Sequence, residues 1–149
     1  QSPVLFNPDR EFVHTIGQDR PLGWTDTQAA AGAWLRAHAS PSDVLATNVT
    51  VGAVVPALSH LTTYISAINL QAPYGRSSDV ADTLTREAET WSFIDGPSTA
   101  TVAPLCRAGV RWLWINPSHT KATSWSPYAS IAWSAPDVTI ARLNPSACP

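Results

Sequence analysis

The sequence predicts an α/β fold, a layered domain with about three mainly parallel central strands, helical crossovers and a C-terminal antiparallel hairpin. Three observations lead to this prediction. A capped amphipathic helix runs directly into a short apolar strand over residues 25–48, a six-residue apolar run fills residues 110–115, and two strand-like segments flank a Pro-Asp turn near the C-terminus. We therefore expect one domain over residues 25–149, with residues 1–24 as an N-terminal arm packed on it.

The first predicted unit begins at Thr25. Thr25 and Gln28 have the spacing of a capping box, in which each side chain satisfies the other residue's free backbone N–H. Ser40-Pro41 ends the helix, because a residue before proline avoids the helical region. The apolar run 44–47 then predicts a strand covered on both faces. The positions that share one helical stripe are Ala30, Ala31, Trp34, Leu35 and His38.

The middle of the chain predicts two further helices and a second strand. Residues 51–60 predict a short helix, and the β-branched run 61–68 predicts a strand. A longer helix is expected from a Ser78 cap to a stop at residues 95–97, with acidic Asp79 and Asp82 favoured in its first turn by the helix dipole. The core-facing positions expected on it are Val80, Leu84, Ala88 and Trp91.

The last part of the chain carries the best strand signal. A short helix is expected over 101–108 with Gly109 as its C-terminal cap. The run 110–115 is apolar on both faces, which predicts a central position in the sheet. Segments 130–133 and 138–143 predict the antiparallel hairpin.

Composition narrows the class of protein. The net charge is −2 and the basic residues are scattered, which argues against a nucleic-acid partner. The chain is 44% hydrophobic and 13% charged, as in globular domains, and it contains no methionine. We expect it to be processed or to be a piece of a longer protein. A membrane span needs an apolar run of roughly 20 residues, so any such span is expected outside these residues.

The two cysteines allow two interpretations. In an oxidising compartment Cys106 and Cys148 would form one disulfide that ties the C-terminal residues to the domain. The alternative is two unrelated thiols, one on a helix and one on the tail.

No recognised catalytic motif is present, so no catalytic residue is predicted. The four histidines, His14, His38, His60 and His119, are far apart in the sequence and lack metal-ligand spacing, so we expect no metal and no cofactor in this chain. Asp79 and Asp82 are explained by the helix dipole without invoking a carboxylate pair.

The best candidate ligand site is the segment that contains Tyr74, Arg76, Ser77 and Ser78. It follows a predicted strand and precedes a helix, where α/β sheets bind ligands and helix N-termini offer free N–H groups to anions. Arg76 would pair with a phosphate or carboxylate, and Tyr74 would stack on a sugar. The structural alternative is a turn followed by a helix cap.

Other residues are weaker candidates. Trp34, Trp91, Trp112 and Trp114 fall on predicted core faces, whereas Trp24, Trp125 and Trp133 are less constrained and could face a sugar, a membrane interface or a neighbouring domain; among these three, Trp125 is our candidate ligand contact. Thr47 and Asn48 end the first strand and point towards where a ligand would lie. Asn48-Val49-Thr50 also matches the N-glycosylation pattern, which often occurs by chance.

Four segments together resemble a soluble domain that follows the last membrane spans of bacterial polytopic proteins similar to GT-C type glycosyltransferases. One segment departs from the resemblance, because His60-Leu61 stands where the Ser-Gly-Arg element of that domain usually has Gly-Arg. The segments are residues 29–48 (AAAGAWLRAHASPSDVLATN), 55–61 (VPALSHL), 106–115 (CRAGVRWLWI) and 137–143 (DVTIARL).

The resemblance implies a domain at the extracytoplasmic face of the membrane. It would cover a membrane-embedded active site or assist the binding of an acceptor or glycan, with the membrane portion of the parent chain and a glycan or lipid-phosphate-linked sugar as partners. The catalytic acids of that family lie in loops between membrane spans, so none is carried over. The alternative is a secreted stand-alone binding or interaction module without catalysis. A small cytoplasmic enzyme would need a catalytic constellation that the sequence lacks.

Overall fold

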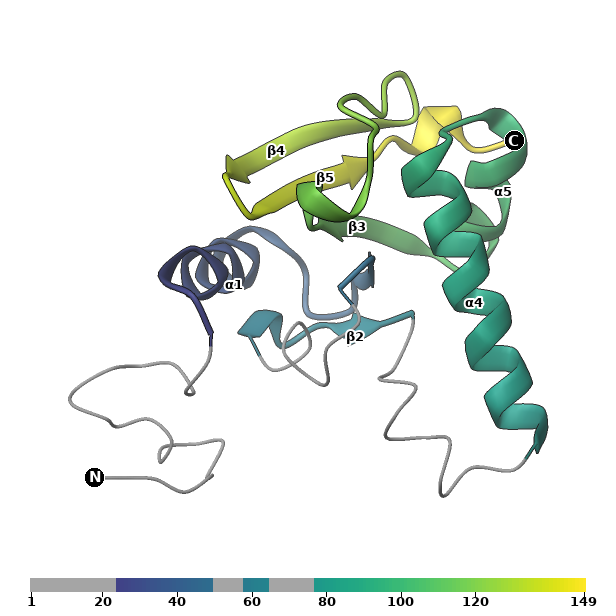
Figure 1. Cartoon of the computed structure of the whole chain (residues 1–149), viewed down its shortest axis with the longest axis horizontal. Coiled ribbons are helices and arrows are strands. Elements are labelled where there is room, and N and C mark those ends of the chain that lie inside the picture. The colour runs from purple at the N-terminus through teal and green to yellow at the C-terminus, as the bar shows by residue number, and fades with distance from the viewer. Residues whose placement is uncertain (1–23, 50–57, 65–76) are drawn as a thin grey trace.

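The computed structural model describes residues 24–49, 58–64 and 77–149 (Figure 1). These residues form an α/β structure with a five-stranded mixed sheet and three helices, which confirms the predicted class. The helices are α1 (Asp26–His38), α4 (Ser77–Asp95) and α5 (Thr99–Arg107). The strands are β1 (Val44–Thr47), β2 (Thr62–Thr63), β3 (Val110–Ile115), β4 (Ala129–Ala135) and β5 (Val138–Leu143), and two short 3-10 turns are η2 (Pro117–His119) and η3 (Pro145–Ala147).

The sheet has the order β2-β1-β3-β5-β4. β1 pairs in parallel with both β2 and β3, and β5 pairs antiparallel with β3 and with β4. The predicted bounds of β1, β3 and β5 are confirmed, and β3 occupies the middle of the sheet as its apolar sequence indicated.

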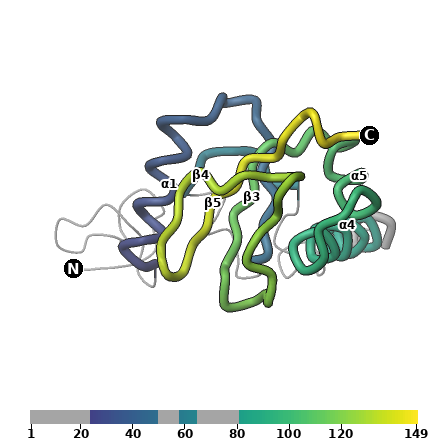
Figure 2. The backbone as a smooth tube through the Cα atoms, turned by 90° about the horizontal axis from the view of Figure 1, so that it is seen from above, coloured from purple at the N-terminus to yellow at the C-terminus, as the bar shows by residue number. Residues whose placement is uncertain are grey.

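The sheet has a packed cluster of buried side chains on each face. On β3, Trp112 and Trp114 belong to the cluster that contains Leu35 of α1, whereas Leu113 and Ile115 belong to the cluster that contains residues of α4 and α5. This division follows from the alternation of side chains along a strand. Figure 2 shows α1 to one side of the strands and α4 with α5 to the other.

The start of α1 is fixed by a helix cap and by the hairpin turn. The predicted capping box between Thr25 and Gln28 is present. The Thr25 hydroxyl also donates a hydrogen bond to Asp137 Oδ2 at 2.9 Å, and the Thr27 hydroxyl donates to Asp137 Oδ1. Asp137 lies in the β4–β5 turn, so its carboxylate meets the positive end of the α1 dipole. The first helix is thereby tied to the last hairpin.

The structure corrects the predictions for α4. The helix begins at Ser77, so Ser78 lies within it and does not precede it as a cap. The buried side chains described on this helix are Thr83, Thr90, Phe93 and Ile94, of which Phe93 and Ile94 belong to a core cluster, whereas Leu84, expected in the core, is 49% exposed. Its stop at Asp95 is as predicted.

Cys106 and Cys148 form a disulfide, which decides between the two interpretations of the cysteines. Their Cα atoms are 5.7 Å apart, and the bond joins the last turn of α5 to the C-terminal residues across a sequence separation of 42. For a loop of this length, the restriction of the unfolded chain stabilises the fold by about 4 kcal/mol.

Some sequence predictions fall wholly or partly outside the described residues. Residues 1–23 of the N-terminal arm lie outside them. Of the helix predicted over 51–60, only Leu58 and Ser59 are described as helical, and of the strand predicted over 61–68, Thr62 and Thr63 pair with β1. Residues 65–68 are outside the described part of the chain.

Gly32 allows α1 to approach the segment at Leu58 closely. Gly32 is buried, and a Cβ atom placed on it would lie 2.6 Å from the Leu58 carbonyl oxygen and 2.7 Å from Leu58 Cβ. One turn later the Arg36 guanidinium donates a hydrogen bond to the same carbonyl. The contact is between backbones, so a larger residue at position 32 would have to displace main chain.

We expect Gly32→Ala to destabilise the domain by about 1–3 kcal/mol in a urea unfolding experiment. Alanine is the better helix former by about 1 kcal/mol, so the loss would show that steric overlap outweighs helix propensity. Gly96→Ala is the matched control, because the nearest atom to its added Cβ is Ser92 O at 3.6 Å. A Gly32→Ala variant as stable as the parent would contradict the close approach.

Candidate functional site

The sheet order places a topological switch point between β1 and β3. From β1 the chain continues to β2 on one side, and it later enters the sheet again as β3 on the other side. In open α/β sheets, ligands bind outside the carboxyl ends of the two parallel strands at such a point. These ends are Thr47 of β1 and Ile115 of β3, and the candidate site lies at the residues that follow them.

Asn48 and Asn116 join the two strand ends. The Asn48 amide nitrogen donates a hydrogen bond to Asn116 O at 3.2 Å, and the Asn116 backbone N–H donates to Asn48 Oδ1 at 2.7 Å. Beside them the Thr47 hydroxyl donates to Trp114 O at 2.7 Å. Asn48 is fully buried, so the folded domain does not present it as a glycosylation acceptor. The hydrogen bonds between Asn48 and Asn116 hold the two strand ends together at the switch point.

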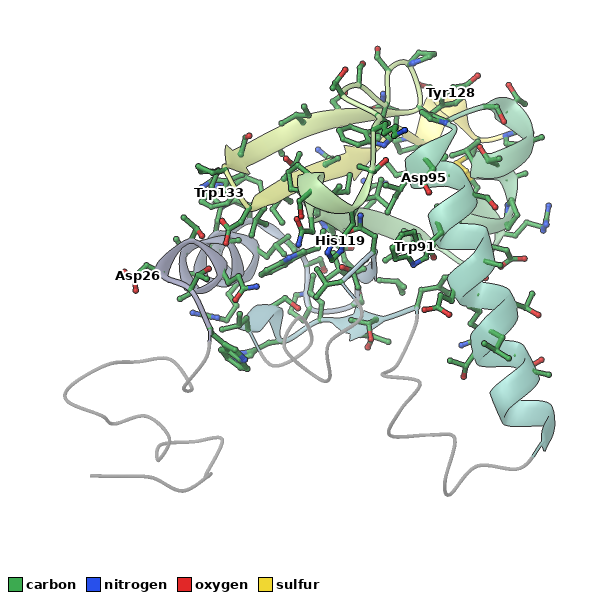
Figure 3. All side chains as sticks on the ribbon, viewed as in Figure 1. Asp26, Trp91, Asp95, His119, Tyr128 and Trp133 are labelled. Carbon is green, nitrogen blue, oxygen red and sulfur yellow. A yellow bond between two sulfur atoms is a disulfide. The ribbon has the colours of Figure 1, made fainter. Side chains whose placement is uncertain are left out.

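The Asn116 side chain organises the turn that follows β3. Its Oδ1 accepts hydrogen bonds from the Ser118 backbone N–H at 3.0 Å and from the Ser118 hydroxyl at 2.8 Å. This side chain therefore caps η2 and brings the exposed His119 to the carboxyl edge of the sheet. Figure 3 shows His119 and Trp91 of α4 directed toward one another; their ring centroids are 6.4 Å apart and the rings are inclined by 14°.

Trp125 holds the C-terminal end of α4. Its indole N–H donates a hydrogen bond to Ile94 O at 2.9 Å, and only 3% of the residue is exposed. The Thr120 hydroxyl makes a longer contact of 3.5 Å with the same carbonyl. Trp125 was a predicted ligand contact, but it serves here as a core residue that satisfies a free carbonyl of the helix end.

The other predicted site residues are not brought together by the described structure. Tyr74 and Arg76 lie outside the described residues, and Ser77 and Ser78 lie in the first turn of α4. The candidate site thus consists of Asn48, Asn116, Ser118, His119 and Trp91. Asn48 was noted from the sequence. Asn116 carries the same signal, a polar residue directly after an apolar strand, and could have been found by it.

A second polar cluster lies where β2 meets α4. The Tyr64 hydroxyl donates a hydrogen bond to Glu89 Oε1 at 2.5 Å, and the Arg86 guanidinium lies 5.3 Å from the centre of the Tyr64 ring. Burial raises the pKa of Tyr64 to about 12, and the hydrogen bond and negative charge of Glu89 add to this effect. The cluster ties α4 to the sheet.

Comparisons with protein-family models, with curated proteins and with solved structures gave no match. Within residues 24–49, 58–64 and 77–149, no helix is long and apolar enough to cross a membrane. The same residues contain no group of three or more His, Cys, Asp or Glu side chains that could hold a metal ion.

We expect Asn48→Ala to lower the free energy of unfolding by about 2–3 kcal/mol, because it removes two hydrogen bonds and leaves the partly buried Asn116 backbone N–H without its partner, while the Asn116 carbonyl still accepts from the His119 N–H. Urea unfolding measures the change. Ser118→Ala is the control in the same turn, and as an exposed substitution it should cost at most about 1 kcal/mol. An Asn48→Ala variant no less stable than Ser118→Ala would contradict the expected contribution of the Asn48 hydrogen bonds.

We expect the Tyr64 hydroxyl to ionise with a pKa of about 12, above the ordinary tyrosine pKa of 10.0. Folding retains the Tyr64 proton between these values, so this contribution to stability is complete below pH 10 and is lost as the pH rises through 12. The absorbance of tyrosinate is measured as the pH is raised. Subtracting the same titration of the Tyr64→Phe variant isolates the ionisation of Tyr64. Glu89→Gln should lower the midpoint, and a midpoint that does not change would exclude Glu89 as a cause.

Proposed function

We propose that this chain is a soluble extracytoplasmic domain of a multispanning membrane protein similar to the GT-C type glycosyltransferases. In this role the domain covers the membrane-embedded active site or assists the binding of an acceptor or glycan. The chain carries no residue to which we assign catalysis. Its partners are the membrane portion of the parent chain and a glycan or lipid-phosphate-linked sugar.

The Cys106–Cys148 disulfide is the observation that carries this proposal. Disulfides form and persist in exported proteins and are rare in the reducing cytoplasm. The bond therefore supports a location outside the cytoplasmic membrane. It also weighs against the cytoplasmic enzyme, which would require both thiols to be free.

The backbone at His60 agrees with the resemblance on which the family assignment rests. His60 stands where the resembled domain usually has glycine, and its φ is +62°. This left-handed conformation costs most residues free energy and is the one that glycine adopts readily. A glycine in the resembled domain and a left-handed histidine here are consistent with one backbone path.

We also propose that the domain has the layered arrangement predicted from its sequence, with helical crossovers between the parallel strands. The separation of the buried side chains into one cluster with α1 and another with α4 and α5 supports this arrangement. The carboxyl edge, where the exposed Ser118 and His119 follow Asn116, is then the part of the domain available for the glycan or acceptor.

The location can be tested in cells that express the protein from its complete gene. We expect the chain to remain in the membrane fraction after an alkaline wash and to be cleaved by protease added outside the cytoplasmic membrane. Both cysteines should resist a maleimide reagent until a reductant is added. A chain found free outside the cell would support the stand-alone secreted module, and a cytoplasmic chain with two reactive thiols would overturn the proposal.

A further inference from the structure

The described residues contain two pairs of a tryptophan and a histidine with nearly parallel rings, and the pairs differ in spacing. Trp34 and His38 are one turn apart on α1, and their ring centroids are 4.1 Å apart at an angle of 13°. Trp91 and His119 come from α4 and η2, and their centroids are 6.4 Å apart at 14°. Carbon atoms in contact are about 3.5–4.0 Å apart. The rings of the first pair are in face-to-face contact, whereas the ring centroids of the second pair are too far apart for such contact.

The Trp91–His119 pair lies near the switch point, and its ring nitrogens are open to a ligand. His119 is exposed and Trp91 is half-buried, and neither ring is hydrogen-bonded to another described residue. Asn116 holds the turn on which His119 lies. Exposed Asp95 lies one helical turn beyond Trp91 on α4 (Figure 3). The site thus combines an aromatic face with an imidazole, an amide and a carboxylate.

This combination favours a neutral, hydroxyl-rich ligand. The apolar face of a sugar ring can pack on an indole, while its hydroxyl groups both donate and accept hydrogen bonds. The imidazole can donate and accept, the Asn116 amide can donate through its NH₂ group because its Oδ1 already accepts from Ser118, and a carboxylate accepts. A free phosphate would gain nothing from the indole face, and the negative charge of Asp95 would disfavour it.

We propose that Trp91 and His119 form a sugar-binding subsite, in which the ring of one glycosyl unit packs on the Trp91 indole and the neighbouring His119 imidazole forms hydrogen bonds with its hydroxyl groups. Asn116 acts as a positioning residue, because it fixes the turn that presents His119. The subsite rests on the proposed function, in which the domain assists glycan binding, and it identifies where that contact is made.

The subsite can be tested by NMR titration of the ¹⁵N-labelled 149-residue chain with the methyl glycosides of mannose, glucose, galactose and arabinose. We expect a saturable shift of the Trp91 indole N–H signal with at least one of them, at about millimolar affinity, which corresponds to roughly 4 kcal/mol. Trp91→Phe assigns the signal. His119→Ala should weaken binding by about tenfold, because the hydrogen bonds of the imidazole to the sugar are lost.

His38→Ala is the matched control, because it removes the histidine of the Trp34–His38 pair and should leave the affinity unchanged. Absence of a saturable shift with all four glycosides up to about 50 mM would overturn the proposal. Equal affinity in His119→Ala, or a shift with sodium phosphate alone, would overturn it as well. These outcomes leave the cellular location untouched, so failure of the subsite is distinguishable from failure of the proposed function.

Discussion

The parallel pairing of β1 with β3 is the contact on which the other features of the structure depend. It brings Thr47 opposite Trp114, although β2, α4 and α5 lie between them in the sequence. The pairing gives β3 its two buried faces and lets the hairpin extend the sheet through β5. It also creates the switch point, because β1 then has a parallel neighbour on each side. A contact this distant in sequence costs loop-closure entropy, which the buried side chains of both clusters must offset.

Local chemistry explains which parts of the fold could be predicted. The capping box at Thr25 depends on residues three apart, and the strand at 110–115 is a continuous apolar run, so both signals are contained in short segments. The orientation of α4 is different. Leu84 lies on the apolar stripe predicted from helix periodicity, yet the structure exposes it. Thr83, Thr90 and Phe93 are buried instead. Threonine methyl groups can pack against a sheet while the hydroxyl bonds to the helix backbone, as Thr90 does with Arg86 O.

The candidate site could be predicted only in part, because it depends on strand order. In the sequence a polar residue follows an apolar strand at Asn48 and again at Asn116. Neither occurrence shows that the two strands are neighbours in the sheet. Trp125, a predicted ligand contact, is buried in the structure. Its surroundings in the sequence are polar, and its burial depends on the Ile94 carbonyl, a group on another element. Side chains whose partners are far along the chain are therefore the ones that sequence patterns describe least well.

The spacing between Trp91 and His119 is set by separate contacts on the two sides. On the His119 side, Asn48 holds the backbone of Asn116, and the Asn116 side chain caps the turn. On the Trp91 side, Trp125 and Thr120 hold the last turn of α4 through Ile94, while Tyr64 holds an earlier turn through Glu89. Trp125 and Thr120 belong to the same loop as His119, so this loop supports both members of the pair. A pair fixed in this way loses little conformational entropy when a ligand packs on the indole, which is the advantage of a preorganised site.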